Sequence, residues 1–358
     1  METKASAENT HHDHLPKDLK EGYGWVMYRL PGSKEIIFLV GETTEERPED
    51  ESFAVSSFVG GAEKAWHIIP QVRLVIDDAN SIPILEKKHL YHLEEKGEST
   101  PFQHYCGLVS EVIKNIEEGH LLKAVPARTK HIALPDSFSL FTLYNSLLDT
   151  YPNAFVYVLS TPPTGTWTGC SPELLFRARG NEIETLSLAG TKKNTTLGST
   201  EFSNKEWVEQ QLVTQYIQTI LEKYCEPIDV HGPILQQAGN VQHLATRFKA
   251  VLRPENNGNY GLLINDLHPT PAVCGLPLEA SKKMLAEHEG FDRALYSGYL
   301  GPISKTSADL YVNLRCMQVF ENSSQLYAGA GVVQGSVPEK EWEETEEKML
   351  TIGRFLGH

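Results

Sequence analysis

The sequence has no long hydrophobic run and few cysteines. No apolar run in its 358 residues reaches the roughly 18 residues that a membrane-spanning helix needs. The first residues, METKASAENTHHDHLPKDLKEG, lack the basic region followed by an apolar stretch that marks a secretory signal peptide. The five cysteines are odd in number and form no CxxC pair, which argues against a disulfide framework and a zinc site. These absences favour the reducing cytoplasm.

Basic tracts are also missing, and the net charge is −15 at pH 7. An acidic protein without a basic patch is a poor partner for nucleic acid and for anionic membrane surfaces. An anionic substrate would therefore need local help from an arginine, a lysine or a metal ion. The hydrophobic share of 40% and the charged share of 22% are ordinary for a globular protein with a large core.

The chain divides into a tail, an N-terminal part and a region that holds the candidate chemistry. Residues 1–20 predict a flexible tail whose HHDH segment, residues 11–14, could bind a metal, although its polar surroundings favour no function. Residues 21–100 predict strands that form the N-terminal part of a sheet scaffold. Residues 101–358 are expected to form one compact unit with residues 21–100.

Hydrophobic periodicity predicts several helices separated by strands. The helices are TPFQHYCGLVSEVIKNIEEGHL, FSLFTLYNSLLDTYP, KEWVEQQLVTQYIQTILEKYC, LEASKKMLAEHEG and PEKEWEETEEKMLTIGRFLG. AFVYVLST, TWTGCSPELLFRARG and EIETLSLAGT predict three strands of one meander, and DLYVNLRCMQVF predicts one more. In LLKAVPARTKHIAL, Pro126 indicates an edge strand or a bulge. The whole pattern predicts an α+β (α/β) fold, with two packed antiparallel sheets and helices outside.

Two pairs of glutamates stand three residues apart near the starts of predicted helices. Glu206 and Glu209 form one pair, and Glu341 and Glu344 form the other. Residues three apart share a helix face, so each pair can aim two carboxylates at one point. The plain interpretation is that acids suit helix N-termini because of the helix dipole. The sharper hypothesis is a hard-cation site, because Mg²⁺ binds carboxylate oxygens, water and a substrate anion.

Three more charged residues stand in apolar surroundings. Lys123 lies in a strand-like run and would be a candidate general base if it points inward, because burial lowers a lysine pKa. Glu173, in SPELLF, is either an edge-strand surface residue or a buried general acid. Arg315, in VNLRCMQV, needs an anionic partner, which is either a protein carboxylate or a ligand.

The order of several blocks along the chain is more informative than any single residue. The blocks are LKAVPAR, GCSPELLF, LSLAGTKK, KEWVEQQ, VQHLATRF, LHPTPAVCGLP, FDRALYSGYLGP, VNLRC and AGAGVVQGSVPEKEWEETEEK. In this order they resemble the chorismate-utilising enzymes, which include anthranilate, aminodeoxychorismate, isochorismate and salicylate synthases. The resemblance covers about residues 100–356, and the first hundred residues match only loosely.

Within that family, three positions resemble isochorismate synthases, which convert chorismate to isochorismate by water attack at C2 and loss of the 4-hydroxyl group. Lys123 matches the lysine of the members that add water. Ala189 stands where aminodeoxychorismate synthases carry a nucleophilic lysine, and alanine cannot form a covalent adduct. LVTQYIQ differs from the Asp-Leu-Val-Arg-Asn-Asp-like stretch of the ammonia-using members. The alternative is salicylate synthase, which also expels pyruvate.

The segment LHPTPAVCG, residues 267–275, has two prolines and fits neither a helix nor a central strand. It looks like the loop of isochorismate synthases that lies against the substrate ring, which implies that Ala272 belongs to the wall of the site. The prolines would fix that wall at low entropic cost. A merely structural loop is the other interpretation.

The resemblance also implies a role for each site residue. Lys123 would deprotonate the attacking water, and Glu173 would protonate the departing hydroxyl group. The positions that would contact the substrate chorismate or line its site are Gly190, Thr191, His243, Thr246, Ala272, Arg315, Gly329 and Lys348.

The cofactor that the resemblance implies is Mg²⁺. Glu209 and Glu344 match its direct ligands, and Glu206 and Glu341 match supporting acids that act through water. One departure from the family pattern is Gln210, which stands where a histidine usually follows the metal-binding glutamate. This change removes no catalytic atom.

The implied mechanism also predicts a geometry. Lys123 and Glu173 are expected to face each other across a ring-sized gap, too far apart for a salt bridge, because the two proton carriers must flank the ring. Beyond chorismate we expect no nucleic-acid or membrane partner, and a protein that is a monomer or a weak dimer.

Overall fold

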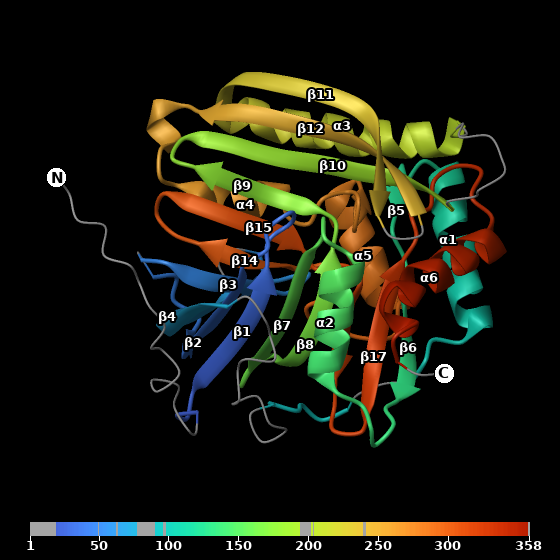
Figure 1. Cartoon of the computed structure of the whole chain (residues 1–358). Coiled ribbons are helices and arrows are strands. Elements are labelled where there is room, and N and C mark those ends of the chain that lie inside the picture. Colours follow the sequence, from blue (N-terminus) through green and yellow to red (C-terminus); the bar gives the residue numbers. More distant parts are fainter. Residues whose placement is uncertain are drawn as a thin grey trace.

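A computed structural model (Figure 1) describes residues 19–48, 50–61, 64–76, 90–95, 98–193, 202, 204–238 and 241–356. The HHDH segment of the predicted tail lies outside these residues. The backbone at 191–193 is described as a strand without its side chains, so the side chain of Thr191 is outside the description too. Among the described helices none is long and apolar enough to cross a membrane.

The described strands pair in an antiparallel manner throughout, and fifteen of them form one hydrogen-bonded sheet. In sheet order these strands are β11 (Cys225–Ala238), β12 (Val241–Leu252), β10 (Glu182–Lys193), β9 (Leu174–Arg179), β15 (Ser307–Val312), β14 (Tyr299–Ile303), β3 (Ser52–Ser56), β4 (Trp66–Ile76), β2 (Ile36–Thr44), β1 (Tyr23–Arg29), β7 (Phe155–Thr161), β8 (Gly165–Ser171), β16 (Cys316–Val319), β17 (Ser323–Gly329) and β6 (Ala127–Ala133). A separate two-stranded ladder joins β5 (Lys123–Ala124) to β13 (Gly275–Leu276). Pro126 interrupts the strand between β5 and β6, and β6 is an edge strand, as the proline indicated.

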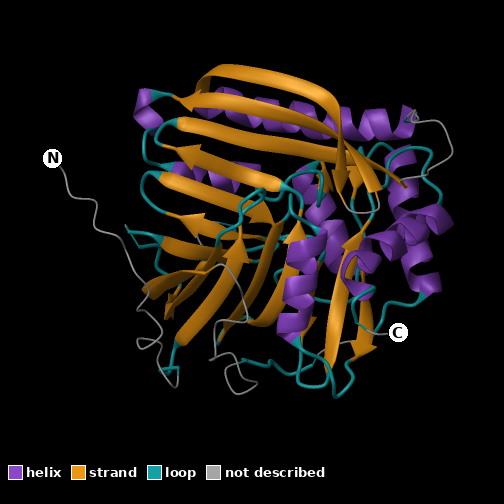
Figure 2. Ribbon diagram, viewed as in Figure 1, coloured by secondary structure: helices purple, strands orange, loops and turns teal. Residues whose placement is uncertain are grey.

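The long sheet folds over, so that two groups of strands face each other. We call β11, β12, β10, β9, β15 and β14 the first arm, and β1, β7, β8, β16, β17 and β6 the second arm. The two arms run at a steep angle to each other (Figure 2), and β3, β4 and β2 join them. The rings of Phe155 in β7 and Tyr311 in β15 stack with centroids 4.5 Å apart, although their strands are far apart in the sheet order. The two packed sheets expected from the sequence are therefore two arms of one sheet.

Helices cover the outer faces of the arms, as the sequence predicted. They are α1 (Phe102–Glu117), α2 (Leu140–Thr150), α3 (Asn204–Tyr224), α4 (Tyr260–Leu267), α5 (Leu278–His288) and α6 (Pro338–Gly353), with a short 3-10 helix at Pro254–Asn256. Helix α3 buries Val213, Ile217 and Leu221 against a core shared with the first arm. Helix α2 buries its apolar stripe, including Leu143 and Leu147, against a core shared with the second arm. Both stripes show the helical spacing that the sequence displayed.

Two segments predicted as unbroken strands are in fact bent where the chain passes from one arm to the other. Strand β8 ends at Ser171 in the second arm, and β9 begins at Leu174 in the first. Strand β15 ends at Val312 in the first arm, and β16 begins at Cys316 in the second. The prediction of one meander through TWTGCSPELLFRARG is therefore wrong. A hydrophobic pattern shows that a strand is buried but does not show where it turns a corner.

The two bends lie side by side and hold each other. The amide of Val312 donates a hydrogen bond of 3.0 Å to the carbonyl of Glu173, and the amide of Cys170 donates one of 3.0 Å to the carbonyl of Arg315. Arg315 adopts a left-handed backbone with φ of 49°, a conformation that non-glycine residues adopt at a cost. We call this paired bend the corner. It turns Glu173 and Arg315 out of the strands and toward the space between the arms.

The strands of residues 21–100 lie in the middle of the sheet. Strands β3, β4, β2 and β1 stand between β14 and β7, which both belong to the region after residue 100. Both parts of the chain therefore contribute strands to one sheet. That residues 21–100 and 101–358 form one unit, with a division at residue 100, stays a prediction.

Replacing Phe155 with alanine should destabilise the fold strongly, because the ring is fully buried between the arms. The loss of transfer free energy and the cavity left behind predict a decrease in unfolding free energy of about 3–5 kcal/mol. Denaturant unfolding followed by circular dichroism measures it. Leu262→Ala is the matched control, because Leu262 is 52% exposed and its truncation should cost less than about 1 kcal/mol. Equal losses in the two variants would contradict the account of the arms.

Candidate active site

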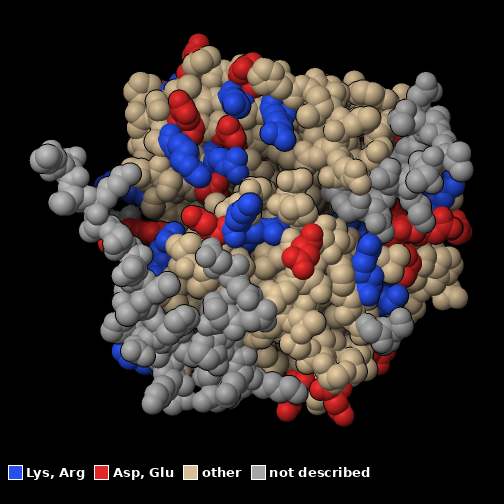
Figure 3. Space-filling model, viewed as in Figure 1, with Lys and Arg blue, Asp and Glu red and all other residues tan. Residues whose placement is uncertain are grey.

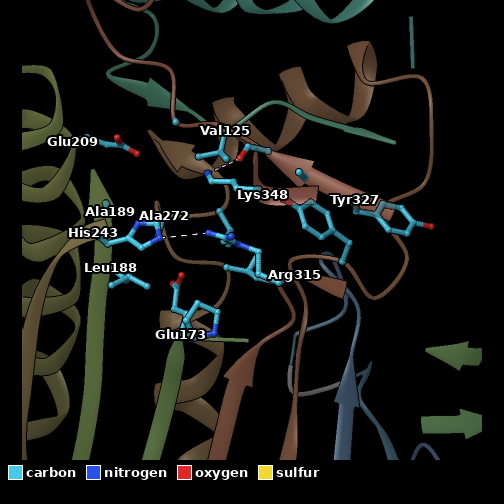
Figure 4. Close-up of a pocket in the computed structure, with 17 residues that line it drawn as sticks. Val125, Glu173, Leu188, Ala189, Glu209, His243, Ala272, Arg315, Tyr327 and Lys348 are labelled. Atoms are coloured by element: carbon cyan, nitrogen blue, oxygen red, sulfur yellow. Dashed lines mark hydrogen bonds between the residues drawn. The ribbon is translucent and has the colours of Figure 1, made fainter. Parts of the chain in front are cut away.

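A pocket opens beside the corner, between the two arms (Figure 4). The side chains that line it come from both arms, from α3 and α6, and from the 267–275 loop. They are Val125, Pro172, Glu173, Leu188, Ala189, Glu209, His243, Ala272, Val273, Tyr296, Leu314, Arg315, Tyr327, Ala328, Gly329, Gly331 and Lys348. The pocket measures about 50 Å³, whereas a cavity that holds benzene has roughly 150 Å³. The expected ring-sized gap is therefore not open, and a ring can enter only if side chains move.

Glu173 projects from the corner into this pocket and is buried. Burial raises the pKa of its carboxyl group to about 8, because taking a carboxylate out of water disfavours its charged form. Lys123, Lys348 and Arg315 oppose this shift by their positive charge, but burial outweighs them. At neutral pH the group is therefore mostly protonated, which is the state that a general acid needs.

Arg315 points from the other strand of the corner toward the same space, and Figure 4 shows its guanidinium beside His243. Its Nη1 donates to Thr351 at 3.0 Å, and its Nη2 lies 3.4 Å from Nε2 of His243. Burial, Arg315 and Lys348 hold the pKa of His243 well below its usual value, so the ring is neutral and can accept this hydrogen bond. No carboxylate in the described residues pairs with Arg315, which leaves its charge available for an anionic ligand.

Lys348 lies on α6 and closes another side of the pocket. Its ammonium group donates a hydrogen bond of 2.8 Å to the carbonyl of Gly329 and lies 2.7 Å from Oε1 of Glu344. Gly329 ends strand β17 and lines the pocket, as the sequence suggested. The site therefore has two cationic groups, Arg315 and Lys348, at the walls of one small space.

Lys123 points inward from β5 and is completely buried. Its ammonium group lies 3.0 Å from Oε1 of Glu209, without the alignment of a hydrogen bond. The side chain stands behind Glu209 and is not among the residues that line the pocket. Among the described residues it forms no ion pair with Glu173, and the expected placement of the two groups on opposite sides of a ring stays a prediction.

Three of the four predicted metal-binding carboxylates lie in the neighbourhood of Lys205. The charges of Glu341, Glu344 and Glu209 all raise the pKa of Lys205 against the effect of its burial. Lys205 pairs with Glu341 at 2.5 Å. Burial, and then the neighbouring charge of Glu344, raise the pKa of Glu341. Glu206, the fourth residue, is half-buried at the start of α3.

The chemistry of these residues suits a divalent cation, because carboxylate oxygens are the ligands that Mg²⁺ prefers. In the arrangement that the structure describes, no three carboxylate, histidine or cysteine side chains stand close enough together to hold a metal ion, so binding requires the carboxylates to move. Oε2 of Glu341 is buried without a hydrogen-bond partner, and such an orphaned oxygen is what a cation or its water would satisfy. Gly331 lies directly against Glu209, since a Cβ atom there would stand 1.9 Å from Oε1. The missing side chain leaves room for the carboxylate beside the pocket.

The 267–275 loop is fixed by the scaffold rather than by its prolines alone. The amide of Val125 donates to the carbonyl of Cys274 at 2.8 Å, which joins the loop to the segment after Lys123. The buried guanidinium of Arg293 donates to the carbonyls of Val273 and Val125 at 2.9 and 2.7 Å. Ala272 and Val273 are thereby held at the pocket wall, where the sequence placed Ala272.

Not every predicted site residue reaches the pocket. The described ones that do not line it are Lys123, Gly190, Thr246, Glu206, Glu341 and Glu344. Gly190 sits at a bulge of β10 with φ of 67°, and its Cα packs on the backbone of Glu206. Thr246 stands behind the wall, where its hydroxyl group accepts a hydrogen bond of 3.2 Å from Gln210. These two residues support the site, because they hold α3 against β10 and β12.

Sequence analysis missed the aromatic side of the pocket. Tyr296 and Tyr327 line it, and their rings stack with centroids 5.5 Å apart. Trp167 stacks on the far side of Tyr327 at 5.4 Å. Tyr296 stands in the block FDRALYSGYLGP, and Tyr327 comes directly before the block AGAGVVQGSVPEKEWEETEEK. Aromatic residues in strand patterns are, however, usually core residues. The sequence carries no signal that would separate these two from the core.

The chain resembles known proteins in sequence over most of its length. A family model described as "Chorismate binding enzyme" matches residues 46–357. An isochorismate synthase of Escherichia coli (strain K12) is 32% identical over 259 residues, which cover 70% of this chain and 59% of that relative. An isochorismate synthase of Bacillus subtilis (strain 168) is 29% identical over 285 residues, which cover 75% of this chain and 71% of that relative. The match thus spans about three fifths of the Escherichia coli protein.

Solved structures share the fold. The menaquinone-specific isochorismate synthase of Escherichia coli superposes with a TM-score of 0.79 at 23% identity, covering 94% of this chain and 90% of that one. Component I of the anthranilate synthase of Streptococcus pneumoniae superposes with a TM-score of 0.68 at 16% identity, covering 98% and 95%. At these identities the superpositions establish the fold and leave the reaction open.

Glu173→Gln should make the stability of the protein less dependent on pH. The carboxyl pKa is raised from 4.5 to about 8 on folding, so the folded state binds a proton that the unfolded state has lost. The stability that this proton contributes is complete below pH 4.5 and disappears as the pH rises to 8. Between pH 5 and 8 the wild type should lose about 1 kcal/mol per pH unit relative to Glu173→Gln, measured by denaturant unfolding. Parallel curves would mean that the buried carboxyl is ionised.

Proposed function

Because the chain belongs to the chorismate-binding enzyme family, we propose that it is an isochorismate synthase. Its reaction would add water at C2 of chorismate and release the 4-hydroxyl group as water, so that the net change is an isomerisation. The observation that carries the proposal is the buried Glu173, protonated near neutral pH, in a pocket that also presents two cationic groups. The relatives named as isochorismate synthases support the choice within the family.

The substrate would bind through its two carboxylates. Chorismate is a dianion, and Arg315 lines the pocket without a carboxylate partner among the described residues. Its guanidinium, held by Thr351 and His243, would receive the enolpyruvyl carboxylate together with Lys348. The planar rings of Tyr296 and Tyr327 would exclude water on that side. Binding therefore requires Lys348 to shift from Glu344 toward the ligand.

The proposed chemical step needs one proton acceptor and one proton donor. Neutral Lys123 would take a proton from the water whose oxygen bonds to C2, while the double bonds shift and the C4–O bond breaks. Glu173 would give its proton to the departing hydroxyl group, because hydroxide is a poor leaving group. The cycle ends with Lys123 protonated and Glu173 ionised, and one proton must return from lysine to carboxylate before the next turnover.

Lys123 must lose its proton before it can act. Its side-chain nitrogen lies 3.0 Å from Oε1 of Glu209, which is also a proposed metal ligand. The proposed base and the proposed metal site therefore share one carboxylate.

We propose Mg²⁺ as the cofactor, held by Glu209 and Glu344 with the support of Glu206 and Glu341. When bound, the ion would supply the positive charge that the ring carboxylate needs. Lys205 and Lys348 now neutralise two of these carboxylates and would have to leave them. The buried, unpartnered oxygen of Glu341 supports this assignment.

Salicylate synthase is the second candidate, since it would form isochorismate and then expel pyruvate from the same site. An isochorismate synthase of Pseudomonas aeruginosa named for salicylate biosynthesis is 33% identical over 259 residues, covering 70% of this chain and 54% of that relative. Incubation with chorismate and Mg²⁺ separates the two. Isochorismate without pyruvate supports the synthase, whereas salicylate fluorescence with equimolar pyruvate supports the lyase.

We further propose that the protein works in the cytoplasm as a monomer or weak dimer, without a nucleic-acid or membrane partner. The net charge of −15 and the odd set of five cysteines support this setting. Size-exclusion chromatography with light scattering tests the oligomeric state.

Lys123→Gln and Glu173→Gln should each reduce kcat by about 10²–10⁴-fold while changing KM little, because each removes one proton carrier and keeps the side-chain size. Wild-type kcat should fall above pH 8, where Glu173 ionises. Chorismate consumption under saturating Mg²⁺ measures both effects. Lys114→Gln is the control, since Lys114 is exposed on α1. A variant whose KM rises at unchanged kcat would mean that its residue binds substrate and transfers no proton.

Gly331→Ala should weaken Mg²⁺ binding specifically, because the new methyl group would displace the Glu209 carboxylate. The Mg²⁺ concentration for half-maximal activity should rise about tenfold or more, a size typical of disturbed support around metal ligands. The fold should tolerate the change, because the clash involves the end of a flexible side chain. Gly107→Ala is the matched control, since nothing lies within 4 Å of its added Cβ. An unchanged Mg²⁺ requirement in Gly331→Ala would remove Glu209 from the metal site.

A further inference from the structure

A second, larger cleft adjoins the pocket on its outer side. It measures about 710 Å³. It is lined by residues 234–237 of β11, by residues 150–154 at the end of α2 and after it, and by residues at the C-terminal end of α6. Pro172 and Arg315 line both the cleft and the pocket, so the corner is their common wall. A molecule that reaches the small pocket from this side must first occupy the cleft.

The charged side chains that line this cleft are all positive. Its described lining residues include Arg247, Arg315 and Arg354 and no aspartate or glutamate. Carboxylates begin outside the lining, since Arg247 also lines an adjoining pocket together with Glu184. The lining therefore differs from the chain as a whole, whose net charge is −15.

The arginines at the cleft differ from their basic neighbours because they have no carboxylate partner. Within the part of the chain that the structure describes, neither Arg247 nor Arg354 forms an ion pair, and Arg354 only donates to the carbonyl of Leu350 at 2.9 Å. Further along the same strands, Arg177 pairs with Asp309 at 2.7 Å and Lys249 with Glu184 at 3.7 Å. Figure 3 shows this basic group over β9, β10 and β12 with acidic residues among it. The arginines that line the cleft thus have no ion-pair partner among the described residues.

We infer that this cleft is a capture site for the dianionic substrate, in which Arg247 and Arg354 hold a carboxylate before the molecule passes the corner to Arg315. The inference rests on the proposed function and adds two binding residues to it. It also answers how an acidic protein attracts a substrate of the same sign. A cleft with walls of low dielectric constant focuses the field of a few charges and raises the local anion concentration.

The small size of the pocket explains why a capture site would help the substrate to bind. At about 50 Å³ the pocket must open before a ring can enter, and its lysine–glutamate pairs must separate. A dianion waiting in the cleft supplies the charge that competes with Glu344 for Lys348. The occupied cleft therefore favours the opening that the substrate needs, and the free cleft does not.

The test is the salt dependence of catalysis in Arg247→Gln, Arg354→Gln and the double variant. At about 10 mM ionic strength, where screening reaches about 30 Å, kcat/KM of the double variant should fall about five- to twentyfold. At 1 M salt, where screening shortens to about 3 Å, the loss should shrink below about twofold. The value of kcat should stay within about twofold of the wild type throughout, because neither residue touches the reacting atoms.

Two control variants separate a local effect from one of net charge. Lys305→Gln removes the same charge from an exposed turn between β14 and β15, and its kcat/KM should not change. Asp149→Asn removes a negative charge from an exposed residue next to Thr150, which lines the cleft, and kcat/KM should rise at low salt.

Three outcomes would overturn the capture site while leaving the proposed function intact. They are an unchanged kcat/KM in the double variant at low salt, a loss of equal size at low and high salt, and an equal loss in Lys305→Gln. If the wild-type protein with Mg²⁺ consumes no chorismate, the proposed function itself fails, and the capture of this substrate fails with it. The wild-type measurement therefore comes first.

Discussion

The corner between the two arms is the constraint on which the site depends. At this point two neighbouring segments of the chain pass between the arms, one from β8 to β9 and the other from β15 to β16. The two segments exchange backbone hydrogen bonds at the bend. Glu173 and Arg315 occupy the bends, where their side chains turn into the pocket between the arms. A continuous flat strand would send alternate residues to fixed faces and could not aim an acid and a cation into the same space. The left-handed backbone of Arg315 is the local cost of this arrangement.

The second feature that organises the site is the pairing of buried lysines with glutamates. Lys123, Lys205 and Lys348 each pair with a glutamate that the sequence identified as a candidate metal ligand. A buried charge is tolerated only with a partner, so these pairs keep the site folded without committing its carboxylates permanently. Glu173 solves the same problem differently, by staying protonated. The site thus contains lysine–glutamate pairs that can separate and a neutral carboxyl group that can donate a proton.

The sequence predicted the fold class, five of the six described α-helices and several residues of the pocket, and the reasons for its failures are physical. Helical spacing and block order are local properties, so α3 and α6 and the glutamates on them were found directly. Glu173, Arg315 and His243 were found through block resemblance, but their convergence depends on the corner, which no local pattern encodes. Tyr296 and Tyr327 were missed because a buried aromatic at a pocket wall has the same sequence signature as one in a core. The single continuous sheet was missed because pairing partners far apart in the chain leave no periodic trace.

The pairing of strands that lie far apart in the sequence also limits the order in which the protein can fold. Strand β3 pairs with β14, where Ser56 lies opposite Tyr299. Strand β6 pairs with β17, where Ala133 lies opposite Ser323. Contacts between such distant residues are slow to form, because a long loop must close before they gain any free energy. During synthesis, the early strands leave the ribosome long before their partners exist. The acid, the base and the cationic wall are therefore expected to assemble together, only after α6 (Pro338–Gly353) has been made, because Lys348 lies on that helix.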